Sequence, residues 1–465
     1  MYCFKEKEFN VAFKDDSGDF KQHSLTKTEG ALFPFGSHDL QELKKTGFDL
    51  KILVSQYFGH LSGEKNKEIS FEQIFEQLKT DLIIDTDLIP ELQNIVKDYF
   101  FTEEGTIRPL NLTLIRQVNP KDSNVISKIG NYMAFVLGDK ENIEQIFDEC
   151  FVNEEEYLNV FEQWFNTAVS KTTEQVSSTN YYKVKESFNE IYEKDFRYLL
   201  SNSIEIDETL SFLLNLYYLS YTSQTLLTLN QFSSGSATEN IPLYFCFGNE
   251  KTDQNRDCYL KGWKFLQPAV QNAFIHAVFF AFMNIGYQFN EMVDYITLKN
   301  ECEDSFDRAY IISQLKTLLN CYKDGYLNKK DDKTKEEFQR KEILDSFTLD
   351  QALKTIFDCI KLKVSDDVRK KVGQSFELTI KQRFLKPRGR NGNMLTITEA
   401  DLISLTKICI KGKDKILLNS LFEEFQKRGI YFDSISKKEI EGYFEKLSLI
   451  DKKSDSGEAK YVKRI

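Results

Sequence analysis

One short stretch has the residue types of a phosphate-binding loop. Gly59-His-Leu-Ser-Gly-Glu-Lys65 brings two glycines and a lysine close together. In the P-loop of nucleotide-binding proteins the lysine directly follows the second glycine, and a Ser or Thr hydroxyl comes next to hold magnesium. Here Glu64 precedes Lys65 and Asn66 follows it. The spacing therefore excludes a nucleotide site of this kind.

Residue types that hold metals or act as nucleophiles are few and scattered. The chain has no Cys/His cluster, no G-x-S-x-G motif and no helical metal-ligand spacing among its four histidines, His23, His38, His60 and His276. His276 lies among apolar residues of an expected helix, so we interpret it as a hydrogen-bonded core residue. Acid-rich stretches such as Glu154-Glu-Glu156 lack the nearby lysine of metal-dependent nucleases and are more typical of helix N-termini.

These absences predict a protein that is not an enzyme and that needs no metal or cofactor. Catalytic residues can also lie far apart in a sequence, where no local motif shows them. A metal-dependent nuclease subunit with an unrecognised site in the body is therefore the alternative prediction.

Basic residues gather in a segment that joins two parts of the chain. Residues 381–390 contain five cations beside Gly and Pro, which predicts a flexible basic linker over residues 381–394. A cationic segment of this kind suits contact with the phosphates of DNA. The candidate phosphate contacts are Arg383, Lys386, Arg388 and Arg390. A solvated linker without a ligand is an equally good interpretation.

The residues after this linker predict a small helical unit. Caps and apolar spacing predict a helix over 398–410, a short strand over 414–418, and a helix that Asn419 caps and that ends at Arg428-Gly429. A capping box at Ser436–Glu439 begins a third helix, and a strand, turn and strand occupy 448–464. This order of elements is that of a winged helix-turn-helix, which we predict over residues 395–465.

The cations of this unit are the second set of candidate DNA contacts. Two lie on the third helix and five on the final hairpin: Lys437, Lys438, Lys452, Lys453, Lys460, Lys463 and Arg464. The third helix also carries Glu439, Glu441 and Glu445, and a helix of balanced charge reads DNA poorly. We therefore expect the hairpin and the linker to contact double-stranded DNA more than the helix does. Protein docking by the same unit is the equal alternative.

Charge is distributed unevenly over the 465 residues. From Lys381 onward 19 Lys and Arg stand against 12 Asp and Glu, a net charge of +7, so the earlier residues carry −18 of the total of −11. An acidic body with a basic end predicts nucleic-acid contact that is local. The eight cysteines form no C-x-x-C, and the first residues lack the apolar core of a signal peptide, which predicts a cytoplasmic protein.

The fold class predicted for the chain is mainly α: a multi-helix body with a C-terminal winged helix-turn-helix domain. The expected divisions are a mixed N-terminal domain over 1–110, a helical body over 111–380, the linker and the winged helix. Apolar spacing predicts helices over 69–78, 88–101, 123–137, 142–151, 154–169, 181–200, 207–229, 268–289, 305–322 and 349–362. Residues 49–58 and 110–115 fit strand or helix, and 241–250 predicts a buried strand. The most hydrophobic stretch, 273–287, is shorter than a bilayer span, so we predict a buried helix and no membrane partner.

Two stretches together resemble a known family. One is Pro242-Leu-Tyr-Phe245 with Arg256 and Gly262-Trp263; the other runs from Leu421 to Asp433 and leads to 449–462. In these places the chain resembles the DptG (DndG) family, a component of the DNA phosphorothioation-dependent restriction system of bacteria.

The resemblance implies a role in antiviral defence. A family member works with the partner proteins DptF and DptH, to which the ATPase activity belongs, and together they restrict DNA that lacks the sulfur-modified backbone. The resemblance carries no catalytic motif. The expected function is therefore a non-catalytic subunit of a restriction complex, whose body docks its partners and whose basic end contacts DNA. An operator-binding regulator is disfavoured because so large an acidic body is unusual for that task.

Overall fold

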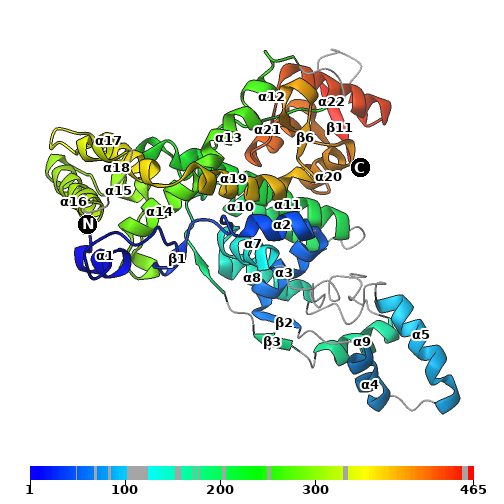
Figure 1. Cartoon of the computed structure of the whole chain (residues 1–465). Helices are drawn as coiled ribbons and strands as arrows, with labels where there is room; N and C mark the ends of the chain where they lie inside the picture. The colour runs from blue at the N-terminus through cyan, green and yellow to red at the C-terminus, as the bar shows by residue number, and fades with distance from the viewer. Residues whose placement is uncertain are drawn as a thin grey trace.

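The computed structural model describes residues 1–48, 50–66, 71–81, 85–101, 124–151, 159–170, 173–175, 178–201, 206–248, 253–327, 334–452 and 459–465. Helices dominate it and the strands are short, so the prediction of a mainly α fold is confirmed. Figure 1 shows a broad helical body with a separate group of helices at one end and the C-terminal elements above.

The centre of the body is the long helix α11 (Ile206–Leu229). Between Thr209 and Leu229 every side chain on it is buried. Four helices cover it: α3 (Leu50–Ser62), α10 (Asn189–Ser201), α13 (Trp263–Gln271) and α20 (Glu399–Ile410). An apolar helix without a polar face must be covered on all sides, and the helix predicted over 207–229 is confirmed. One hydrophobic cluster includes Tyr57, Tyr217 and Phe444, and it therefore joins early, middle and late parts of the chain.

A second core lies beside the first. It forms where α1 (Glu6–Phe13), α14 (Ala273–Met283), α16 (Ser305–Asp324) and α18 (Leu349–Lys363) pack together. His276 on α14 is buried there, and its Nδ1 lies 3.0 Å from the Tyr295 hydroxyl. The prediction of a hydrogen-bonded core histidine is confirmed.

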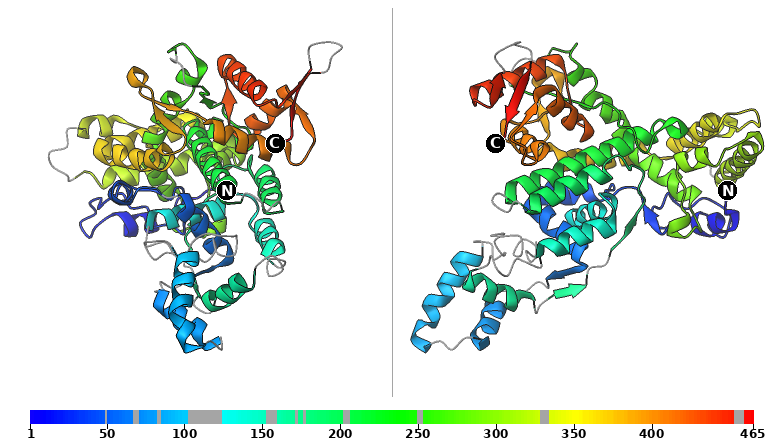
Figure 2. Two further views of the ribbon diagram at one scale, coloured as in Figure 1. Left: turned by 90° about the vertical axis from the view of Figure 1, so that its right-hand side faces the viewer. Right: turned by 180° about the vertical axis from the view of Figure 1, so that it is seen from behind.

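Three helices form a small lobe that projects from the body. They are α4 (Phe71–Asp81), α5 (Ile89–Phe100) and α9 (Val160–Ser170), and they share a hydrophobic cluster of their own. Within it the Phe100 and Phe165 rings stack with their centroids 3.9 Å apart. The antiparallel strands β2 (Glu64–Asn66) and β3 (Thr173–Gln175) lie between the lobe and the body (Figure 2).

The C-terminal elements follow α19 (Asp366–Lys381). Strands β6 (Leu385–Pro387) and β7 (Asn393–Leu395) form an antiparallel hairpin before α20. After α20 come β8 (Lys415–Leu417), α21 (Leu418–Lys427), β9 (Tyr431–Phe432), α22 (Ser434–Lys446), β10 (Ile450–Lys452) and β11 (Lys460–Lys463). Strands β10, β11 and β8 form one antiparallel sheet in that order. From α20 onward the succession is therefore helix, strand, helix, short strand, helix and two strands, and the sequence predicted all of these except β9.

The remaining elements complete the body. Strand β5 (Tyr244–Phe245), expected from the sequence, pairs in parallel with β9 and so joins the body to the C-terminal unit. Strands β1 (Gly30–Ala31) and β4 (Asn180–Tyr181) also pair in parallel. The other helices are α2 (Asp39–Thr46), α7 (Asn124–Val136), α8 (Lys140–Phe151), α12 (Asp257–Leu260), α15 (Tyr295–Asn300) and α17 (Lys335–Arg340), with 3₁₀ turns at 86–88, 232–234, 289–291 and 389–391.

Some local predictions differ from the structure. Of the stretch 49–58, residues 50–58 belong to helix α3, whereas residue 49 and residues 110–115 lie outside the described residues. The helix expected over 268–289 is broken at Asn272, whose side-chain amide donates to Asn230 Oδ1 at 2.7 Å. No single helix in the described ranges is long and apolar enough to cross a membrane, although the pair 257–271 and 273–283, bent by 44°, passes that test together.

Burial of His276 generates a prediction about pH. Burial lowers the pKa of His276 to about 3. In the unfolded chain a histidine has a pKa of about 6.5, so between these values the unfolded state binds the proton and the folded state does not. Stability should therefore fall as the pH drops below about 6.5, by about 1.4 kcal/mol per pH unit.

His276→Gln should remove this dependence, because an amide forms hydrogen bonds without titrating. Urea unfolding of both proteins at pH 7 and pH 5 measures it. Acidification should cost the wild type about 2 kcal/mol more than the variant. The same loss in both proteins would contradict the prediction.

Candidate nucleic-acid interface

The segment expected to be a flexible basic linker is an ordered part of the fold. Residues 385–387 and 393–395 pair as the β6–β7 hairpin, and a 3₁₀ turn closes its tip. The backbone amide of Arg388 donates to Gly392 O at 2.8 Å, and Gly389 and Gly392 both have positive φ. The prediction of flexibility was wrong because the two glycines allow a tight turn and the strands bury Leu385 and Leu395.

The Arg383 side chain makes its contacts inside the protein. Its guanidinium lies 2.7 Å from Oδ1 of Asp401, a buried residue in the first turn of α20, and rests over the Phe212 ring. The carboxylate neutralises the cation, and its side chain is only 19% exposed. The structure therefore does not present Arg383 as a phosphate contact.

The other three hairpin cations lie nearer the surface. Lys386 donates to Gln382 O at 2.8 Å, and Arg388 donates to Gly248 O at 3.2 Å. Arg390 is exposed in the tip. None of the three has an ion-pair partner among the described residues. We call Lys386, Arg388 and Arg390 the hairpin group.

The start of α22 is attached to the body. Asp433 caps the helix by accepting from Ser436 N at 2.8 Å, so the predicted capping box at Ser436 was wrong. Arg256 reaches Asp433 through two hydrogen bonds of 2.8 and 2.9 Å and donates to Ser436 Oγ at 2.8 Å. Burial alone would raise the pKa of Asp433, but the hydrogen bonds from Arg256 hold that pKa well below its usual range. These contacts bury Asp433 and Ser436, whereas Ser434 and Ile435 in the same turn stay exposed.

The two predicted cations on α22 differ in their surroundings. Lys437 lies over the Phe422 ring, with its Nζ 5.1 Å from the centroid, and Lys438 is exposed. Glu439 is also exposed and lies beside Gly248. Lys438 and Glu439 are thus exposed on the same helix, which agrees with the expectation that α22 carries both signs of charge.

The C-terminal sheet places further cations on adjacent strands. In the register of β11, Lys463 lies opposite Lys415 and Lys460 lies opposite Lys452. Lys460 forms an ion pair with Glu441, and Lys415 forms one with Asp451 at 2.8 Å. Those two charges are compensated locally.

Lys463 and Arg464 are exposed at the end of β11. Lys463 Nζ lies 3.4 Å from Ser448 O, and neither residue has an ion pair within the described ranges. Lys453 lies outside the described residues. We call Lys463 and Arg464 the strand-edge group.

The sequence analysis missed a third set of cations. The turn between α20 and β8 reads Lys411-Gly-Lys-Asp-Lys415, three lysines in five residues. Arg464 N donates to Asp414 O at 2.9 Å, so this turn adjoins the strand-edge group. Lysines at alternate positions indicate a cationic surface, but from this stretch only the strand over 414–418 was predicted.

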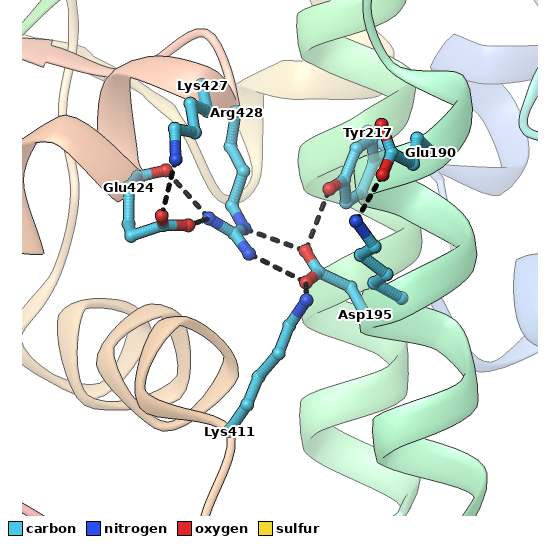
Figure 3. A network of polar contacts seen from close by, with 8 residues as sticks. Glu190, Asp195, Tyr217, Lys411, Glu424, Lys427 and Arg428 are labelled. Carbon is cyan, nitrogen blue, oxygen red and sulfur yellow. Dashed lines mark hydrogen bonds and ion pairs between the residues drawn. The ribbon is translucent and has the colours of Figure 1, made fainter. Parts of the chain in front are cut away.

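Two fully buried charged side chains were not expected from the sequence. Arg428 donates to both carboxylate oxygens of Asp195 at 2.7 Å, and both side chains are 0% exposed. Tyr217 donates to the same carboxylate at 2.8 Å, and Lys411 Nζ lies 2.9 Å from it. Arg428 also reaches the side chain of Glu424 at 3.0 Å (Figure 3). Burial and the nearby Asp195 raise the pKa of Tyr217, so its phenol stays a hydrogen-bond donor.

No local signal could have found this network. Asp195 and Arg428 are 233 residues apart, and each belongs to a charged stretch that resembles an ordinary helix surface. In the sequence Arg428 looked like a cation in the last turn of α21, placed to complement the helix dipole. The prediction that Asn419 caps this helix was also wrong, because α21 begins at Leu418, directly after β8.

The candidate interface therefore consists of two separate sets of cations. The hairpin group touches the body near Gly248, and the strand-edge group adjoins the turn after α20. In the parts of the chain that the structure describes, no group of three or more His, Cys, Asp or Glu side chains is placed to hold a metal ion. Compared with models of known protein families and with curated proteins, the chain matches none.

Replacing the buried Arg428 should lower the free energy of unfolding of the protein. Arg428→Met leaves Asp195 buried with only Lys411 and Tyr217 as partners. Breaking a buried pair in this way is expected to lower the free energy of unfolding by about 3–5 kcal/mol. Urea unfolding followed by circular dichroism measures it.

Lys427→Met is the matched control, since Lys427 is the exposed neighbour and pairs only with Glu424. That surface pair should contribute less than about 1 kcal/mol. Asp195→Asn combined with Arg428→Met should recover part of the loss, because it leaves no unpaired buried charge. Equal losses for Arg428→Met and the control would contradict a dominant role for the network.

Proposed function

We propose that this chain is a non-catalytic subunit of a bacterial phosphorothioation-dependent DNA restriction complex of the DptG (DndG) kind. In this proposal its helical body docks ATPase subunits of the DptF and DptH type in the cytoplasm. Its C-terminal unit is a winged helix, and the exposed cations of that unit contact double-stranded DNA.

The order of the C-terminal elements carries the proposal. Helix α20, strand β8, helices α21 and α22 and the β10–β11 hairpin follow the succession of a winged helix-turn-helix. The sheet order β10, β11, β8 supports the same interpretation, because the outer strand β8 pairs with the last strand of the hairpin. In such folds the hairpin contacts the DNA backbone as a wing.

The surroundings of α22 indicate how DNA would be held. A helix that reads bases needs its N-terminal residues free to enter the major groove. Here Arg256 holds Asp433 and Ser436 at the start of α22 against the body, so these two side chains are not free to contact bases. The proposal therefore assigns DNA contact to phosphates, through the strand-edge group and the hairpin group, with little reading of sequence.

The projecting lobe offers a surface suited to partner docking. Three large apolar side chains are exposed on or beside α5: Leu88 at 52%, Ile95 at 57% and Tyr99 at 42%. Ile95 and Tyr99 are four residues apart and share one face of the helix. Neighbouring exposed apolar side chains are typical of protein–protein contact sites. This stripe supports the adaptor part of the proposal.

Charge reversal at the strand edge should weaken DNA binding. Lys463→Glu with Arg464→Glu removes two exposed cations that have no ion-pair partner within the described chain. A gel shift with a short duplex should show at least about tenfold weaker binding near 100 mM salt. The slope of log affinity against log salt concentration should also fall by about 2.

Lys21→Glu is the control for this experiment, because Lys21 is exposed in the N-terminal part of the chain. A truncation before α20 would be a poor test, since it would expose the face of α11 that α20 covers. Unchanged affinity and salt dependence in the double variant would remove DNA contact from this end of the protein.

The alternative, a metal-dependent nuclease, makes the opposite prediction for the isolated protein. Under the adaptor proposal, the purified chain leaves supercoiled plasmid intact in the presence of Mg²⁺ or Mn²⁺. Agarose gels of plasmid incubated with and without EDTA measure this. Metal-dependent nicking that copurifies with the chain would favour the nuclease.

A further inference from the structure

A cleft lies where the body meets the C-terminal unit. It has a volume of about 500 Å³, and its walls come from α10, α21 and the turn after α20. Cavities of roughly 300–1,000 Å³ are the usual size for small-molecule sites. The cleft belongs neither to the hairpin group nor to the strand-edge group.

Lysines dominate the charged lining of this cleft. Lys194 extends from α10, Lys411 and Lys413 from the turn after α20, and Lys427 from the last turn of α21. The acidic lining residues are Glu190 and Glu424, which leaves a net charge of +2. That excess stands out in a chain whose net charge is −11.

Carboxylates pair with three of the lysines, so Lys413 carries the positive charge that no carboxylate compensates among the described residues. Lys194 pairs with Glu190, Lys427 with Glu424 at 2.7 Å, and Lys411 with Asp195 at 2.9 Å (Figure 3). An ammonium group has three donor protons, so each lysine keeps donors for a further acceptor. Lys413 is exposed and has no ion pair among the described residues.

The floor of the cleft is rigid. Lys411 is tied to Asp195, whose other contacts are the buried Arg428 and Tyr217. Glu424 is held by Arg428 as well as by Lys427. The Lys411 ammonium group is thus held in place before any ligand arrives, which reduces the entropy that binding must overcome.

We infer that this cleft binds a phosphate group. A phosphate monoester carries a charge of nearly −2 and three acceptor oxygens, which matches both the net charge and the surplus donors. Lysine is a common phosphate ligand that acts as a point charge. The group belongs either to a small compound such as a nucleoside monophosphate or to the 5′ end of DNA. The inference goes beyond the proposed function and does not require it.

Calorimetric titration of the full chain tests the site, with inorganic phosphate and dAMP as probes. Binding of both is expected, and phosphate should also raise the melting temperature, because it binds only the folded state. Lys413→Glu with Lys427→Glu should weaken both probes by at least about tenfold, since two cations are replaced by anions. Lys413→Arg, which keeps the charge, should bind within about threefold of the wild type.

Lys21→Glu is again the control and should leave binding unchanged. Should the double variant unfold, Lys413→Gln alone serves as the test, because the Lys413 side chain is exposed. Wild-type protein that binds neither probe would overturn the inference. So would binding as strong as that of the wild type by Lys413→Gln or by the double variant Lys413→Glu with Lys427→Glu.

Two duplexes that differ only in a 5′-phosphate identify the source of the group. A 5′-phosphate that strengthens binding to the wild type, but not to the Lys413 and Lys427 variant, assigns the site to a DNA end. Equal binding of the two duplexes, with dAMP still bound, assigns it to a small phosphate compound. The Lys463 and Arg464 variant should bind dAMP normally, so failure of DNA contact at the strand edge is distinguishable from failure of this site.

Discussion

The position of the C-terminal unit depends on one ion pair that water does not reach. Moving a guanidinium and a carboxylate into a protein interior costs several kcal/mol for each ion, and only complete hydrogen bonding offsets that cost. Arg428 meets this requirement with two bonds to Asp195 and two to Glu424, and Asp195 accepts from Tyr217 and Lys411 as well. A shift by one helical turn would leave both charges unpaired. The pair therefore selects a single docking geometry more than it adds net stability.

That geometry explains the unusual setting of α22. Once Arg428 is fixed, β9 and α22 follow within a few residues, and their next contacts are also with the body: β5 beside β9, and Arg256 on Asp433. At the start of α22 the body therefore holds Asp433 and Ser436, whereas Ser434 and Ile435 stay exposed. The same docking brings lysines from α10, α20 and α21 around one cleft. The docking of the C-terminal unit on the body therefore both attaches the start of α22 and forms the cleft.

Local sequence patterns predicted the helices and strands. Contacts between residues far apart in the sequence determine which charged side chains are paired inside the protein. Apolar spacing identified α11, α16 and α18, because a helix that packs on a core must repeat its apolar residues. The same reasoning predicted the three-helix order after residue 395. This reasoning failed for the β6–β7 hairpin, because the basic composition of residues 381–394 was interpreted as that of a linker. Arg383 and Arg428 were misassigned because their carboxylate partners, Asp401 and Asp195, can be identified only after the chain has folded.

The parallel pairing of β5 with β9 has a consequence for how the protein is made. Tyr244 lies beside Tyr431, so β5 lacks its partner strand until a much later part of the chain has been synthesised. Until then α11 lacks the cover of α20, and Asp195 lacks Arg428. A nascent chain shorter than about 430 residues must therefore expose apolar surface and an unpaired carboxylate, a state that chaperones recognise and that is prone to aggregate. For this fold, α11 is covered and Asp195 is paired with Arg428 only after both α20 and Arg428 have been synthesised.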